Sequence, residues 1–344
     1  MLIFYIINKP FNFINSKNIY SFLQYCNYIF NPVFTFNFEI DILKLYLKIK
    51  NYGVKVMEFN NIQLFEKPIT QIIRERTSIR SYNNKPLNSE LADKVIHLLN
   101  ESKGPFGTDT RFKLINANID HIDSNLKLGT YGVIKGTSCF IASAVKNDTN
   151  NLFELGYILE KGILYATSLG LGTCWLGGTF KKGEFAKIME LKEDEILPII
   201  TPIGYSSESR RLIDSFIRMS AGSKNRKPWS EIFFNNKFSK PLTESDAAEY
   251  SIPLEMVRLA PSASNKQPWR VVRSGDNYDF YIEHTKGYGK AFSYDIQMVD
   301  MGIALCHFEL TALELGLAGN WQHLKTNIKE LSPLTEYVIS WVRK

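Results

Sequence analysis

Two arginines and a serine lie close together early in the main body of the 344-residue chain, at Arg76, Ser78 and Arg80. Arginine presents forked N–H donors that match phosphate oxygens, and a serine hydroxyl adds a neutral donor. If the two guanidinium groups converge, this segment can hold one phosphate; the alternative is a pair of solvated surface cations. A later basic segment around Arg226 could bring another cation to that phosphate, or it could link two parts of the chain.

A second segment that could do chemistry spans residues 259–269. It is too rich in small polar residues and prolines to be a core element. Its Asn265 and Gln267 side chains carry both amide donors and acceptors, as recognition of the edge of a heteroaromatic ring requires. The alternative is a turn that leads into a strand.

A glycine-rich segment at residues 170–179 fits neither of the two familiar nucleotide-binding loops. Position 175 is Trp where the dinucleotide fingerprint needs its third glycine, and Gly178 is followed by Thr179 where a Walker loop needs lysine. Two interpretations remain for Gly177 and Gly178. They form backbone that a flat ligand can approach closely, or they belong to a helix cap.

The sequence offers little support for metal or nucleophile chemistry. The five histidines show no paired ligand spacing, and no serine lies in a GxSxG elbow. The four cysteines are far apart and form no CxxC pair, which excludes a disulfide scaffold and a zinc ribbon and suits a reducing cytoplasm. We therefore expect no metal site and a cytoplasmic location.

An internal repeat organises the elements that must position these residues. An acid, a glycine, a Leu-Gly-Leu and a tryptophan recur at one constant offset: Glu154 and Asp300, Gly156 and Gly302, 169–171 and 315–317, Trp175 and Trp321. Each block has the apolar spacing of a helix and ends in glycine, a natural helix stop. Strand-like runs also correspond, 139–145 with 278–284 and 199–204 with 337–342.

These correspondences predict two related α+β halves, at about residues 57–236 and 237–344. In each half, helices would pack on a mixed or antiparallel sheet. A duplicated chain of this kind can imitate a two-fold dimer, with a site in the cleft between the halves. A monomer would then suffice to build the site.

Residues 1–56 differ from the rest in composition, with eight Phe, six Tyr and no Arg. No apolar run in them approaches the ~20 residues of a membrane span. Three interpretations stay open: a poorly structured extension, an amphipathic segment for a partner or membrane surface, or translated sequence upstream of a start at Met57. We assign no function to this segment.

The net charge of +6 gives little support for a polyanionic partner. Residues 1–56 contribute +4 of it, and the remaining 288 residues contribute +2. A nucleic-acid-binding protein concentrates basic charge on one working face, and the main body contains no such block. We therefore expect small-molecule partners, no nucleic acid and no transmembrane segment.

Together these segments resemble the FMN-dependent nitroreductase family, over about residues 57–344. The matching features are the RxSxR at 76–80, the segment at 260–269, the glycine-rich 170–177, and 202–205 leading to Arg226-Lys-Pro. In the common single-domain form, the PSxxNxQPW-like segment follows RxSxR within one repeat. Here it lies in the second half, which has no RxSxR counterpart, so the chain resembles an internally duplicated branch in which one chain mimics the usual homodimer.

The resemblance implies one FMN per chain, bound between the halves. The phosphate and ribityl end would be held by Arg76, Ser78, Arg80 and Arg226. The backbone of Gly177 and Gly178 would face the ring near N5. The residues that reach across from the second half would be Pro261, Ser262, Ala263, Ser264, Asn265 and Gln267.

The resemblance also implies an NAD(P)H-dependent oxidoreductase that reduces nitroaromatic or quinone-type acceptors. Hydride transfer would be ping-pong through flavin N5 and would need no catalytic side chain. A same-fold flavin enzyme with another substrate and a non-enzymatic flavin-binding or interaction protein remain as alternatives. The choice between NADH and NADPH and the identity of the acceptor stay open.

Overall fold

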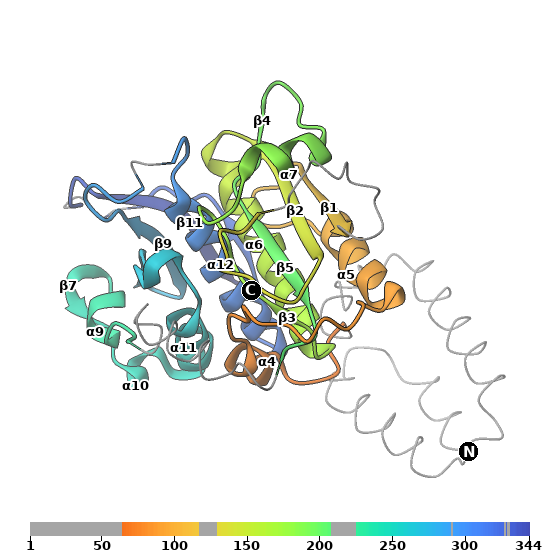
Figure 1. Ribbon diagram of the computed structural model, residues 1–344. Helices are drawn as coiled ribbons and strands as arrows, with labels where there is room; N and C mark the ends of the chain where they lie inside the picture. The colour runs from red at the N-terminus through yellow and green to blue at the C-terminus, as the bar shows by residue number, and fades with distance from the viewer. Residues whose placement is uncertain (1–63, 117–128, 208–224, 290–291, 327, 329–330) are drawn as a thin grey trace, which may run out of the picture. The chain divides into compact units, whose positions relative to one another are not determined.

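The computed structural model describes residues 64–116, 129–207, 225–289, 292–326, 328 and 331–344. Asn60–Lys344 forms one compact unit. The predictions about residues 1–56 therefore lie outside the described residues. The unit Asn60–Lys344 contains every predicted site residue (Figure 1).

The first sheet is built from five strands in the earlier part of the chain. Its order is β1-β2-β5-β3, with β4 paired to β2, and all of these pairs are antiparallel. Its strands are β1 (Thr110–Asn116), β2 (Cys139–Lys146), β3 (Gly172–Thr173), β4 (Glu195–Ile196) and β5 (Ile200–Gly204). The helices of this part are α4 (Ile69–Glu75), α5 (Ser89–Glu101), α6 (Thr149–Ser168) and α7 (Lys182–Met189).

The second sheet has six strands, in the order β10-β11-β9-β8-β6-β7. Its pairs are antiparallel except β6 with β8, which run parallel. Its strands are β6 (Phe233–Asn235), β7 (Lys237–Pro241), β8 (Trp269–Ser274), β9 (Asn277–Glu283), β10 (Gly319–Gln322) and β11 (Thr335–Arg343). The helices of this part are α9 (Trp229–Ile232), α10 (Glu244–Ala247), α11 (Ser251–Leu259) and α12 (Ile296–Glu314), with the 3₁₀ turns η3 (Ala248–Tyr250) and η4 (Ala263–Asn265).

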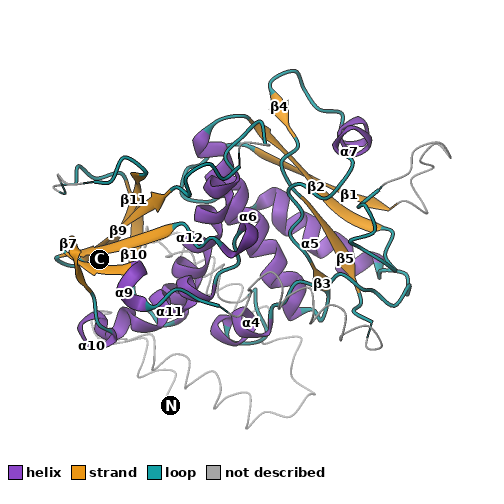
Figure 2. Ribbon diagram, turned by 60° about the vertical axis from the view of Figure 1, so that its left-hand side comes forward, coloured by secondary structure: helices purple, strands orange, loops and turns teal. Residues whose placement is uncertain are grey.

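The two long helices, α6 and α12, lie between the two sheets (Figure 2). Nearly every residue of α12 is buried, which explains its uniformly apolar sequence. By length and composition α12 could cross a membrane, but 89% of the window that passes this test is buried inside the fold. It is therefore the core helix of the fold.

The repeat-related glycines meet where α6 and α12 pack together. A Cβ added at Gly156 would collide with the Val299 carbonyl, and one at Gly302 would collide with the Phe153 carbonyl. Glycine at both positions lets the two backbones approach more closely than any side chain would permit.

Both long helices begin and end in the same way. The Asp148 and Asp295 side chains accept hydrogen bonds from backbone N–H groups of the first turns of α6 and α12. Both ends close on a left-handed glycine, Gly170 at φ 75° and Gly316 at φ 71°. The expected helix ends are confirmed, and their agreement supports the internal repeat.

The fold is α+β, with helices and two largely antiparallel sheets as expected. The predicted strands at 139–145, 199–204, 278–284 and 337–342 appear as β2, β5, β9 and β11. Cys139, Cys174 and Cys306 are buried free thiols, as expected for core residues.

Candidate functional site

A cavity of about 370 Å³ lies between the segments that the sequence singles out. This volume is in the range of small-ligand sites. One group of lining residues is polar: Arg76, Thr77, Ser78, Arg80, Arg226, Ser262, Ser264, Asn265 and Asp300. The others are Trp175, Gly177, Ile199, Pro261, Ala263, Ile296, Val299 and Ile303.

Ten of the twelve predicted site residues line this cavity. They are Arg76, Ser78, Arg80, Gly177, Arg226, Pro261, Ser262, Ala263, Ser264 and Asn265. Gly178 and Gln267 lie outside its wall. Segments that are up to about 190 residues apart in sequence are therefore brought to one place.

The first arginine segment is positioned by α4 and β3. Arg76 is the C-cap of α4, and its backbone N–H donates to the Ile72 carbonyl. The chain then runs extended beside β3, where Ser78 forms a parallel bridge to Thr173. Alternate side chains of an extended segment share one side, which directs Arg76, Ser78 and Arg80 to the cavity.

Two guanidinium nitrogens at this end of the cavity are buried without a hydrogen-bond acceptor in the described part of the chain. They are Arg76 Nε and Arg80 Nη1. Arg76 Nε also lies 3.8 Å from Glu160 Oε1, which is beyond hydrogen-bond range. Buried donors of this kind normally have acceptors, so the site is built to receive one from a ligand.

Arg226 adds a third cation from a different part of the chain. It donates to the Ala260 carbonyl at 2.9 Å, to the Leu259 carbonyl at 2.9 Å and to Asn265 Oδ1 at 2.8 Å. Burial, and then the charges of Arg76 and Arg258, lower the pKa of Arg226 to about 10. Three neighbouring positive side chains at one cavity end favour an anionic group such as a phosphate.

The loop from the second part of the chain is held in an unusual backbone conformation. Ser264, Asn265 and Gln267 all have positive φ, at 48°, 54° and 50°. Such strain in residues other than glycine concentrates at ligand-binding sites. Tyr288 steadies the loop through a 3.0 Å hydrogen bond from its hydroxyl to Ser264 Oγ.

Gln267 fixes this loop through hydrogen bonds and does not itself line the cavity. Its side chain donates to the Asn225 and Asn265 carbonyls at 3.1 and 3.2 Å and accepts from the Lys227 N–H at 2.9 Å. Its own N–H donates to Ser262 Oγ at 2.9 Å. The side chain is buried and its amide groups are engaged by the protein, so the structure places it behind the cavity wall.

Gly177 and Gly178 have close neighbours from the second part of the chain. A Cβ at Gly177 would collide with the Ile296 side chain, and one at Gly178 would lie 3.1 Å from the Phe292 ring. The Tyr294 hydroxyl also donates to the Gly177 carbonyl at 3.3 Å. At Gly177, which lines the cavity, a side chain would collide with the α12 wall.

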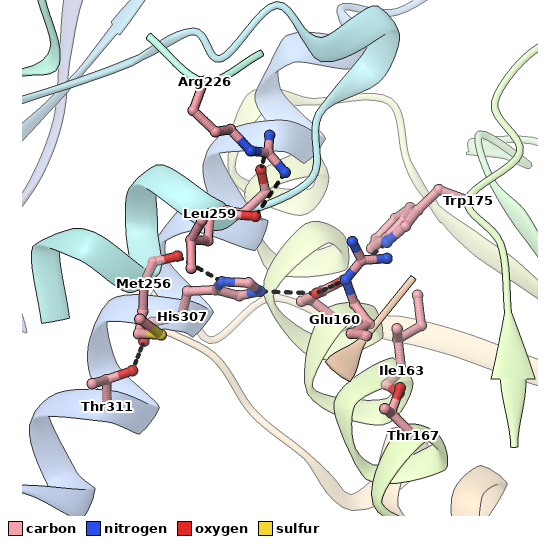
Figure 3. A network of polar contacts seen from close by, with 11 residues as sticks. Glu160, Ile163, Thr167, Trp175, Arg226, Met256, Leu259, His307 and Thr311 are labelled. Atoms are coloured by element: carbon pink, nitrogen blue, oxygen red, sulfur yellow. Dashed lines mark hydrogen bonds and ion pairs between the residues drawn. The ribbon is translucent and has the colours of Figure 1, made fainter. Parts of the chain in front are cut away.

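A buried polar network, which sequence reasoning missed, supports the cavity from beneath (Figure 3). Glu160 and His307 are fully buried and join Glu160 Oε1 to His307 Nε2 at 2.9 Å. Trp175, in the cavity wall, donates from Nε1 to Glu160 Oε2 at 2.9 Å. His307 Nδ1 lies 2.9 Å from the Met256 carbonyl, which can only accept, so Nδ1 carries a proton.

The network joins α6 to α12 through Glu160 and His307. An acid and a histidine within apolar helices were its only sequence signal. They are separated by 147 residues, so their pairing could not be read from spacing.

In the region that the internal repeat relates to the cavity wall, the buried acid makes its hydrogen bonds within the protein. Glu154 accepts from the Gly104 N–H at 2.6 Å and from the Phe106 N–H at 2.9 Å. Phe106 stacks on Phe153, with ring centroids 5.0 Å apart. In place of cations, this region contains an aromatic stack and a capped loop.

The residues present fit FMN. The cavity lining combines buried arginine donors with an apolar α12 face, Trp175 and glycine backbone. This combination suits a ligand with a phosphate at one end and a flat ring at the other. Among the described residues, no group of three or more His, Cys, Asp and Glu side chains could hold a metal ion.

Known proteins resemble this chain in sequence and in fold. A protein-family model described as "Putative TM nitroreductase" matches residues 68–312. The chain resembles the crystal structure of a "putative nitroreductase" from Thermotoga maritima, with 20% identity, a TM-score of 0.51 and coverage of 80% of this chain and 94% of that one. At this identity the likeness shows the fold.

A second solved structure is shorter. An FMN-dependent nitroreductase from Clostridium difficile is 19% identical and covers 40% of this chain and 87% of its own length, with a TM-score of 0.34. Among curated proteins, none matches the sequence. Since the family model spans well over half of the residues, the chain belongs to the nitroreductase family.

Proposed function

We propose that this protein is an FMN-dependent oxidoreductase that uses NAD(P)H to reduce nitroaromatic or quinone-type acceptors. One observation carries the proposal. Arg76, Arg80 and Arg226 all line one 370 Å³ cavity, and two of their buried nitrogens have no acceptor in the described part of the chain. The family membership supports the oxidoreductase class.

In this proposal the chain's own residues bind and orient the cofactor. Arg76, Ser78, Arg80 and Arg226 would hold the phosphate by charge-assisted hydrogen bonds. The backbone at Gly177 and Gly178 would lie against the ring. The loop residues Pro261, Ser262, Ala263, Ser264 and Asn265 would contact the cofactor from the other side, and Gln267 would keep that loop in place.

When bound, FMN supplies the chemistry, accepting a hydride equivalent from NAD(P)H and passing it to the acceptor. The apolar face of α12, with Ile296, Val299 and Ile303, would keep water from the ring. The hydrogen bond from Trp175 to Glu160 would hold the indole still as part of the wall. Under this scheme no side chain acts as a nucleophile or general acid.

We also propose one FMN per chain. The repeat-related region around Glu154 and Phe106 has its hydrogen-bonding groups engaged by the protein. The two halves, about residues 57–236 and 237–344, would then act as one fused pair, and a monomer would hold a complete site.

We propose a cytoplasmic location. Cys139, Cys174 and Cys306 are buried as free thiols, which suits a reducing compartment. The partners would be NADH or NADPH and a small acceptor.

The proposal is tested on the purified full-length chain. We expect about one released FMN per chain, bleaching of the flavin absorbance by NADH or NADPH without oxygen, and recovery on addition of a nitroaromatic or quinone. Two FMN per chain would contradict the single site. Bleaching without recovery by either acceptor class would favour a same-fold enzyme with another substrate, and no FMN binding even after its addition would overturn the proposal.

A further inference from the structure

One face of α12 forms a wall of the cavity through Ile296, Val299, Asp300 and Ile303. Their spacing is that of one helix face. Asp300 is the polar residue on this otherwise aliphatic wall, and it is only 3% exposed. A buried acid in that position needs an explanation, because burying a polar group without partners is costly.

The two oxygens of Asp300 have different surroundings. Oδ1 accepts a hydrogen bond from the Ala263 N–H at 2.9 Å and so anchors the polar loop. Oδ2 is buried and has no hydrogen-bond partner among the residues that the structure describes. None of the ion pairs formed between described residues involves Asp300.

The repeat-related acid provides an internal comparison. Glu154 anchors the corresponding loop, but both of its oxygens accept backbone N–H groups, from Gly104 and Phe106. The Asp300 side chain is one methylene shorter than that of Glu154, and only one of its two oxygens accepts a hydrogen bond. The unpartnered oxygen therefore belongs to the acid that lines the cavity and not to its repeat-related counterpart.

The surroundings of Asp300 favour its neutral form, because the side chain is buried and none of the ion pairs between described residues involves it. Burial raises the pKa of Asp300 well above the usual range, against a smaller lowering by the Ala263 hydrogen bond. Because Oδ1 already accepts, the proton of the neutral acid resides on Oδ2. The group at the cavity wall is consequently an O–H donor.

We propose that Asp300 is a ligand-binding residue of this cavity and donates a hydrogen bond from Oδ2 to the bound flavin. The proposal rests on the proposed function, since it takes FMN as the ligand. Besides the phosphate, which the arginines would hold, FMN offers two kinds of acceptor, the ribityl hydroxyl oxygens and the ring heteroatoms. A deeply buried O–H group that is otherwise without a partner would favour flavins over ligands that lack an acceptor there.

The proposal is tested on the full-length apoprotein by infrared difference spectroscopy with and without FMN. We expect a carbonyl stretch of a protonated carboxylic acid that shifts on FMN binding, disappears in Asp300→Asn and persists in Glu154→Gln. The Glu154 control is needed because burial also raises the pKa of Glu154. A shift with FMN and with lumiflavin, which lacks both the ribityl chain and the phosphate, identifies a ring acceptor. A shift with FMN and riboflavin but not with lumiflavin identifies a ribityl oxygen.

Dissociation constants measured by flavin fluorescence complete the test. Asp300→Asn keeps both an acceptor for Ala263 and a donor at the cavity, so its FMN affinity should remain within about threefold of wild type. Asp300→Ala should bind about tenfold more weakly, and Glu154→Gln should match wild type.

A wild-type chain that binds FMN without a shifted carboxylic acid band would overturn the role of Asp300. Equal losses of FMN affinity in Asp300→Asn and Asp300→Ala would also overturn it, because the hydrogen-bond donor would then not be what determines the affinity. A wild-type chain that binds no FMN would instead overturn the proposed function.

Discussion

Arg226 is oriented by the protein itself, through the carbonyls of Leu259 and Ala260 and the side chain of Asn265. Its guanidinium group therefore loses little conformational freedom when it meets an anion, which increases affinity. Arg80, by contrast, has a buried nitrogen without an acceptor in the described residues. Arg80, like Arg76, therefore has a donor that a phosphate oxygen could satisfy.

This contrast gives a residue-scale prediction. Arg80→Gln should weaken FMN binding by roughly 10- to 100-fold, the value of one charge-assisted hydrogen bond, and should change riboflavin binding by less than threefold. Titrations with the two flavins measure the difference, since riboflavin lacks the phosphate. Lys85→Gln, which removes an exposed cation near the same segment, serves as the control and should leave both affinities unchanged. Equal losses for FMN and riboflavin would argue against phosphate contact by Arg80.

At the scale of elements, the packing of α6 against α12 depends on two glycines. Gly302→Ala should destabilise the fold by about 2 kcal/mol or more, because its methyl group would meet the Phe153 carbonyl and force the helices apart. Urea unfolding measures the change. Gly183→Ala in α7 is the matched control: a Cβ there meets nothing within 4 Å, so we expect a neutral or slightly stabilising effect. A Gly302→Ala variant as stable as wild type would show that the helices can separate without loss.

A second element-scale prediction concerns the ion pair that joins β1 to β4. Arg111 Nε donates to Glu195 Oε1 at 2.8 Å, and this contact is the main reason that the pKa of Glu195 is lowered to about 2. Because the folded-state pKa is depressed, the stabilisation is fully present above the unfolded value of 4.5 and is lost as pH falls toward 2.

The stability difference between wild type and Arg111→Gln should therefore shrink as the pH is lowered from 6 to 3. We expect a change of about 1 kcal/mol, a value reduced for the partial exposure of Arg111. Urea titrations at several pH values test this. Lys103→Gln, which disrupts a pair with the exposed Asp109, should show no such dependence. A pH-independent difference for Arg111→Gln would contradict the assignment.

The elements themselves were largely predictable from the sequence. Apolar runs at 139–145 and 278–284 became β2 and β9 because their side chains are buried on the faces of the sheets. The glycines at 170 and 316 end α6 and α12, since a left-handed residue follows each helix.

The site was predictable only to the extent that its residue types indicated ligand chemistry. Its polar residues were recognisable, but the pairing of Glu160 with His307 joins two helices far apart in sequence, and spacing carries no information about such contacts. Gln267 illustrates the same limit: an amide that could read a ring serves to hold its own loop, because three backbone groups lie within its reach.

For the whole molecule, the cavity depends on both parts of the compact unit. Arg76, Arg80 and Trp175 come from the earlier part, whereas the 261–265 loop and α12 come from the later part. Neither part supplies both the arginine pair and the α12 wall. We therefore expect that disruption of either part abolishes the single site. A symmetric dimer of two identical subunits would instead carry two copies of such a site.

Trp175 lines the cavity, whereas its repeat-related partner Trp321 packs against Phe280 and Trp341, with ring centroids 5.3 and 5.1 Å away. The two indoles therefore make the two regions optically distinguishable, because flavin absorbs where tryptophan emits. At saturating FMN, Trp175→Phe should remove more of the quenching of tryptophan emission than Trp321→Phe. Equal effects would mean that the flavin lies no closer to one indole than to the other. The chain thus contains its own fluorescent reporter of which region is occupied.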